Sequence, residues 1–119
     1  MKKPQAIYCK RVYDPIEAGD RYRVLVDHTW PRSFKKEELA LDDWRKDLAP
    51  STELRKWFGH DPQRWAGFYQ RYHAELREND EAINTLLKEC DGRPLTLLYA
   101  ARDTEHNNAV ALKMYLEDR

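Results

Sequence analysis

Two short apolar segments constrain the fold of this chain more than any other feature. Val24-Leu25-Val26 and the segment Leu95–Ala100 are bounded by turn residues and are too short to be buried helices. Their nearly continuous apolar character is typical of strands that are covered on both faces, as in the sheet of an α/β protein. We therefore predict strands over 22–27 and 95–100.

A further strand is predicted over 6–13, where β-branched and aromatic residues are frequent. Because helical patterns separate the second and third predicted strands, the strands are expected to run in parallel. The fold class is α/β: a single-domain three-layer sandwich with a small, mostly parallel sheet flanked by helices. The domain is expected to span 1–119, with a core from about residue 6 to residue 117.

The middle of the chain begins with short helical signals. A short helix is predicted over 35–41, and a turn or a second short helix over 42–48. Ser51 is suited to cap the start of the next helix, and Gly59 is suited to end it.

Stronger helical signals follow. Asp61-Pro62 begins an amphipathic helix, and Asn79 or Asp80 caps another. The last helix is predicted over 104–117, with Asp103 or Thr104 as its cap.

Composition narrows the function classes. The 21 Lys and Arg residues balance 21 Asp and Glu residues, so the protein has no net field that would gather polyanions. This balance argues against nucleic acid as a partner.

No apolar run approaches the roughly 20 residues of a membrane helix, and none of signal length follows the N-terminus. We expect a cytoplasmic protein with no membrane partner, in which Cys9 and Cys90 are free thiols. A homodimer is left open.

A binding site is expected where the predicted central strands end. Ligands of open α/β sheets bind beyond the carboxyl ends of the strands. The polar segments 27–32 and 99–108 follow two such ends. If these strands are neighbours, Arg32 would face the start of the last helix, where free N–H groups favour an anion.

Several residues that could contribute to this predicted site also have a structural interpretation. Asp27 could accept hydrogen bonds from loop amides, and Trp30 could pack beside Pro31. Arg32 could form a surface salt bridge. Ser51 could act only as a helix cap. His106 is expected in the first turn of the last helix, where capping or packing competes with a catalytic role.

Motifs of the common cofactor and metal sites are absent from the sequence. We find no GxGxxG, P-loop, HExxH, CxxC or GxSxG pattern. The histidines do not form a local metal signature. No metal and no cofactor is therefore predicted.

Several separated blocks of the sequence resemble one family. They read CKRVYDP, YRVLVDHTWPRSF, LALDDWRKDLAPSTELRKWFGHDP and LTLLYAARDTEHNNAVALKMYL. In order and spacing they are similar to the YeaO-like branch of the domain-of-unknown-function 488 (DUF488) family, from about Ile7 to Leu116. The resemblance implies a one-domain α/β sandwich, and it implies no assigned function.

The chain departs from this family at informative positions. The YeaO-like pattern usually reads Asp-Arg-Leu-Trp-Pro-Arg-Gly at the first strand end, where this chain has His28, Thr29 and Ser33 in place of Arg, Leu and Gly. The wider family often carries a cysteine at the end of the last strand and another at the start of the following helix. Here Tyr99 and His106 stand at those places, so a nucleophilic thiol is excluded there.

Two functional hypotheses follow. In the first, the protein binds a small polar or anionic ligand, with a nucleotide-like compound as one example. The predicted ligand-binding residues are Arg11, Asp27, Trp30, Arg32, Lys46, Ser51, Tyr99, Asp103, His106 and Asn107.

In the second hypothesis, the protein is a hydrolase-type enzyme without a covalent cysteine intermediate, in which Asp27 or Asp103 acts as a base and His106 as an acid. Whether the protein is an enzyme is left open.

Overall fold

The strands form one fully parallel sheet. The computed structural model describes residues 2–119, so the predicted domain boundary at Met1 lies outside the described residues. Within them, the strands are β1 (Ile7–Arg11), β2 (Tyr22–Leu25), β3 (Asp43–Trp44) and β4 (Leu95–Tyr99), in the spatial order β1-β4-β2-β3. The two apolar strands, β2 and β4, are parallel neighbours, which is the condition on which the predicted site depends.

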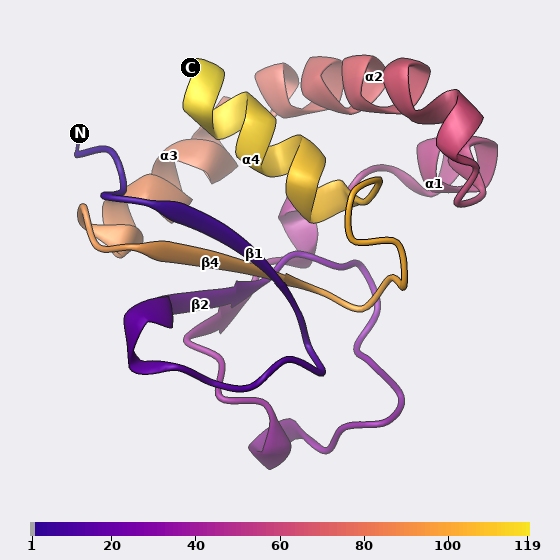
Figure 1. Ribbon diagram of the computed structural model, residues 1–119. Coiled ribbons are helices and arrows are strands. Elements are labelled where there is room, and N and C mark those ends of the chain that lie inside the picture. Colours follow the sequence, from indigo (N-terminus) through magenta and orange to yellow (C-terminus); the bar gives the residue numbers. More distant parts are fainter. Residues whose placement is uncertain (1) are drawn as a thin grey trace.

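The α-helices lie together on one side of this sheet. They are α1 (Thr52–Phe58), α2 (Trp65–Glu78), α3 (Asp80–Cys90) and α4 (Asn108–Asp118). Figure 1 shows them above the sheet, whereas the connections from β1 to β2 and from β2 to β3 pass below it. None of these helices, within residues 2–119, is both long and apolar enough to cross a membrane. The predicted α/β sandwich is confirmed, and its third layer consists of loops and short 3-10 turns.

Alternate residues of β4 contribute to two separate apolar clusters. Leu95, Leu97 and Tyr99 belong to the large core under the helices. Leu98 belongs to a second cluster with Leu25, which the loops cover. All of these side chains are buried. The two-sided burial explains why the sequence of β4 is almost continuously apolar.

The short helix predicted over 35–41 is largely wrong, and the turn predicted over 42–48 is present only in the second half of that segment. The first contains only a 3-10 turn, Lys36–Glu38, and the second contains β3 followed by the 3-10 turn Lys46–Leu48. The cause is tertiary pairing, because Asp42 and Arg45 donate their backbone N–H groups to carbonyls of residues 23 and 25 at 2.8 and 2.9 Å. A two-residue strand has too little pattern to be recognised from sequence.

The last helix begins four residues later than predicted. Asp103 Oδ1 accepts from the backbone N–H groups of Glu105 and His106 at 2.9 and 3.0 Å, which closes a local turn before the helix. Asn107 is the true N-cap, since its Oδ1 accepts from the N–H of Val110 at 2.9 Å. His106 therefore precedes the helix and does not lie in its first turn.

The cap assignment can be tested with paired alanine variants. We expect Asn107→Ala to lower the free energy of unfolding by about 1–2 kcal/mol, because the helix loses its cap at a buried position. Thr104→Ala is the control, since Thr104 is exposed and caps nothing. Urea unfolding measures both values. A larger loss for Thr104→Ala than for Asn107→Ala would contradict the assignment.

Candidate functional site

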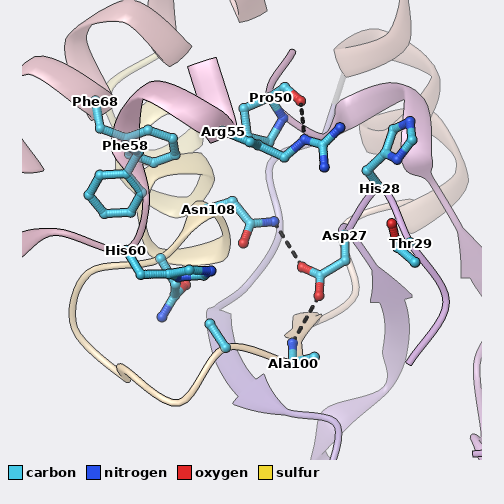
Figure 2. A pocket seen from close by; sticks show the side chains of 12 residues that line it. Asp27, His28, Thr29, Pro50, Arg55, Phe58, His60, Phe68, Ala100 and Asn108 are labelled. Carbon is cyan, nitrogen blue, oxygen red and sulfur yellow. Dashed lines mark hydrogen bonds between the residues drawn. The ribbon is translucent and has the colours of Figure 1, made fainter. Parts of the chain in front are cut away.

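A cavity of about 390 Å³ opens beyond the carboxyl ends of β2 and β4 (Figure 2). This volume lies in the range of small-molecule sites. Loop, α1, α2 and α4 residues form its wall. The lining residues are Asp27, His28, Thr29, Pro50, Arg55, Phe58, His60, Phe68, Ala100, Ala101, Asn107 and Asn108.

Asp27 connects the separate segments of this wall. Its Oδ2 accepts from the backbone N–H of Ala100 at 3.0 Å, and its Oδ1 accepts from Asn108 Nδ2 at 3.1 Å. The same Asn108 amide donates to the carbonyl oxygen of Val26 at 3.0 Å. The carbonyl oxygen of Asp27 itself accepts from Trp44 Nε1 at 2.9 Å. The interpretation that Asp27 accepts a hydrogen bond from a loop amide is confirmed.

Burial dominates the electrostatics of Asp27. It raises the pKa of the carboxyl group above its usual value, although the hydrogen bonds from Asn108 and Ala100 and the charges of His60 and Arg55 act in the opposite direction. Each carboxylate oxygen accepts only one of these bonds and has a further lone pair. Asp27 can therefore accept an additional hydrogen bond from a molecule in the cavity.

Arg55 brings a guanidinium group from α1 to the cavity wall. Its Nε donates to the carbonyl oxygen of Pro50 at 3.2 Å, and its Nη2 donates to Thr52 Oγ1 at 2.9 Å. No carboxylate of residues 2–119 forms a salt bridge with it. The group is thus oriented by neutral partners, and its charge is available to an anion.

Aromatic residues form another part of the wall. The rings of Phe58 and Phe68 stack with their centroids 4.2 Å apart, and His60 lies beside Phe58 at 6.3 Å. Figure 2 shows these rings on one side of the cavity and Asp27, His28 and Arg55 on the other. The cavity therefore has an aromatic side and a polar side.

Of the predicted ligand-binding residues, Asp27 and Asn107 line this cavity. Trp30 instead packs in the second apolar cluster, where it contacts Trp44 edge to face and donates to the carbonyl oxygen of Phe34. Lys46 lies 4.9 Å from the centre of the Trp44 ring. Arg32 is exposed and, within the described chain, makes no side-chain hydrogen bond or salt bridge.

Three further predicted residues have structural partners. Arg11 donates to the carbonyl oxygen of Ala101 at 2.9 Å, and Tyr99 is buried in the core. Ser51 caps α1 as predicted, because its Oγ accepts from the N–H of Leu54, and it also donates to Glu75 at 2.6 Å. The structure places all three outside the cavity lining.

Asp103 and His106 form a pair with each other. His106 Nδ1 lies 2.9 Å from Asp103 Oδ2, and the imidazole packs edge to face on Trp65. Backbone hydrogen bonds from Glu105 and His106, together with the His106 side chain, lower the pKa of Asp103. This pair is not part of the cavity lining, and Asp27 has no hydrogen bond to His106.

Sequence reasoning did not select Arg55, Phe58, His60, Phe68 or Asn108. The sequence pattern places Phe58 and Phe68 on apolar helix faces, which is typical of core residues, and it gives no signal for Arg55. One sequence signal bears on His60. It follows Gly59, a typical helix end, at a place where the chain often needs a positive φ that a residue with a Cβ atom disfavours. Nothing in the local sequence indicates that α1 packs over the strand ends.

Metal ligands do not cluster in this structure. Within residues 2–119, no group of three or more His, Cys, Asp or Glu side chains could hold a metal ion.

The fold and the cavity together define the class of protein: a small α/β sandwich with a ligand-sized cavity at the ends of parallel strands. The sequence matches the DUF488-N3i family, described as the inactive DUF488-N3 subclade, over residues 6–119. The chain therefore belongs to the DUF488 family, and the resemblance found in the sequence is confirmed.

The relatives have no assigned function. The chain is 48% identical to the uncharacterized protein YeaO of Escherichia coli K12 over 110 residues, which cover 92% of this chain and 96% of YeaO. It is 37% identical to the uncharacterized protein Rv3073c of Mycobacterium tuberculosis over 120 residues, which cover both chains completely. No solved structure matches the chain significantly.

The raised pKa of Asp27 predicts how stability depends on pH. Because the folded-state pKa lies above the unfolded value, the contribution of this group is fully present below the unfolded pKa of about 4 and is lost as the pH rises through the folded pKa. Relative to Asp27→Asn, the wild type should therefore be more stable at about pH 4.5 than at about pH 7.5. Urea unfolding at both pH values measures this difference.

The control is Asp118→Asn, an exposed aspartate in the last turn of α4. This side chain forms no hydrogen bond or salt bridge within residues 2–119, so the variant serves as the reference against which the pH dependence of Asp27→Asn is compared. The opposite result would be a wild type whose free energy of unfolding, relative to that of Asp27→Asn, increases with pH. The fold would then stabilise the ionised carboxylate, and the pKa of Asp27 would be lowered and not raised.

Proposed function

We propose that this protein binds a small, polar, anionic ligand in the strand-end cavity. The observation that carries the proposal is that one cavity wall holds the partly buried Asp27 carboxyl group and the Arg55 guanidinium, which forms no salt bridge within residues 2–119. A ligand with a hydrogen-bond donor for Asp27 and an acidic group for Arg55 would complement both. Charge-assisted bonds of this kind are among the stronger interactions available to a protein.

The aromatic side of the cavity supports a ligand that also contains a ring. Phe58 and Phe68 present a stacked apolar surface beside the polar groups. Ligand sites typically combine such a surface with a few oriented polar groups. A nucleotide-like compound, with a ring, donor groups and a phosphate, has all the required features.

Binding without catalysis is better supported than hydrolysis. The Asp103–His106 pair does not line the cavity, and Asp27 is bonded to Ala100 and Asn108. The matching family is described as an inactive subclade. A hydrolase using Asp27 as a base remains the alternative, and it would need a water or substrate at the free side of this carboxylate.

We also propose a cytoplasmic location. Cys9 and Cys90 are unpaired, and burial raises the pKa of the Cys9 thiol to about 11, so this side chain behaves as a small apolar residue.

Two arginine variants test the proposed site. Thermal-shift screening with nucleoside monophosphates and sugar phosphates should identify a compound that stabilises the wild type. Arg55→Ala should weaken its binding by about tenfold or more, because a charge-assisted hydrogen bond is lost. Arg32→Ala is the matched control, since it removes an equal charge outside the cavity.

Two outcomes would contradict the proposal. One is a screen in which no compound stabilises the wild type. The other is a compound whose binding depends on Arg32 and not on Arg55, which would place the site at the exposed 27–32 loop.

A further inference from the structure

His60 has a backbone conformation that its side chain disfavours. Its φ is 56°, in the left-handed region, and it directly follows Gly59 with a φ of 54°. Glycine occupies this region freely, whereas a residue with a Cβ atom is strained there. Such strain persists where the surrounding structure or the function of the residue requires it.

The turn alone does not explain the choice of histidine. Helix α3 ends in the same way as α1, with two consecutive left-handed residues, Asp91 with a φ of 51° and Gly92 with a φ of 76°. At this second helix end, glycine occupies the position that corresponds to His60. The fold therefore accommodates glycine at such a place, and the imidazole of His60 requires a different explanation.

The imidazole points toward the cavity. Figure 2 shows His60 on the aromatic side, near Phe58 and opposite Asp27. Its ring is tilted by 48° relative to that of Phe58. In the part of the chain that the structure describes, neither ring nitrogen has a hydrogen-bond partner. The imidazole is exposed, and within the described chain no internal hydrogen bond offsets the strain, so its ring nitrogens are accessible to a molecule in the cavity.

We infer that His60 contacts the ring of the ligand and selects a heterocycle. The ligand then lies with its acidic group at Arg55 and with its ring against Phe58, where a ring nitrogen of His60 exchanges a hydrogen bond with a heteroatom of the ligand. A nucleoside monophosphate satisfies both ends, whereas a sugar phosphate satisfies only the Arg55 end. This inference rests on the proposed function, because it assigns the ligand class of the same cavity.

The experiment compares AMP with ribose 5-phosphate, which lacks the heterocycle. Isothermal titration calorimetry is performed on the wild type, on His60→Gly and on Asp91→Gly. Asp91→Gly is the matched control. Like His60→Gly, it places two consecutive glycines at a helix end and removes a non-glycine residue with a positive φ, but Asp91 lies outside the cavity lining. Both variants should have a raised melting temperature, because the strain is removed.

The expected result is selective. The wild type should bind AMP more tightly than ribose 5-phosphate. His60→Gly should lose about tenfold of its affinity for AMP and retain its affinity for ribose 5-phosphate. Asp91→Gly should retain both affinities.

Other results overturn different parts of the argument. If His60→Gly retains the AMP affinity, or weakens both probes equally, the role of His60 in selecting the ring is wrong and the proposed function stands. If the wild type binds AMP and ribose 5-phosphate with equal affinity, the role of His60 in selecting the ring is likewise wrong, and the proposed function stands. A lower melting temperature for His60→Gly beside a higher one for Asp91→Gly would show that the imidazole stabilises the fold, which overturns the strain argument. If the wild type binds neither probe, the proposed binding of an anionic ligand in this cavity fails together with the inference.

Discussion

The carboxylate of Asp27 is the interaction on which the rest of the site depends. It joins a strand end to backbone and side-chain donors that lie 73 and 81 positions further along the chain, at Ala100 and Asn108. Parallel pairing of β2 with β4 brings these donors within reach, and the two bonds then fix the end of β4 against the start of α4. The burial that raises the pKa of Asp27 also gives the cavity an acceptor that water does not fully solvate. One side chain therefore has both a structural and a chemical role.

Local signals predicted the fold well. The apolar runs of β2 and β4 and the caps at Ser51 and Gly59 depend on interactions between near neighbours or on burial from both sides, so they are visible in the sequence. The failures have a different origin. β3 exists only because β2 offers partners to its backbone groups, and the start of α4 was misplaced because Asp103 and Asn107 both accept amide hydrogen bonds. Competition between two plausible caps is decided by the path of the loop, which the sequence does not specify.

The candidate site was predicted in place but only partly in composition. The predicted site depended on the two strands being parallel neighbours; β2 and β4 meet this condition, and Asp27 and Asn107 line the resulting cavity. Trp30 was assigned to the same cavity, yet it packs under the loops on the opposite face of the sheet. Arg55 reaches the cavity from α1 and His60 from the turn that follows this helix, and only tertiary packing determines which surface a helix covers. Two residues of the loops that follow the strand ends were thus predictable, and residues from a helix packed over those ends were not.

The central position of β4 has a consequence for biosynthesis. Both β1 and β2 pair with β4 and not with each other, although they precede it by most of the chain. During translation these two strands leave the ribosome long before Leu95–Tyr99, and until then each has an open edge and an uncovered apolar face. Contacts between distant segments form slowly, and exposed strand edges promote association with other chains. The nascent chain therefore depends on its early helices, or on chaperones, to remain soluble until the strand that completes its sheet has been made.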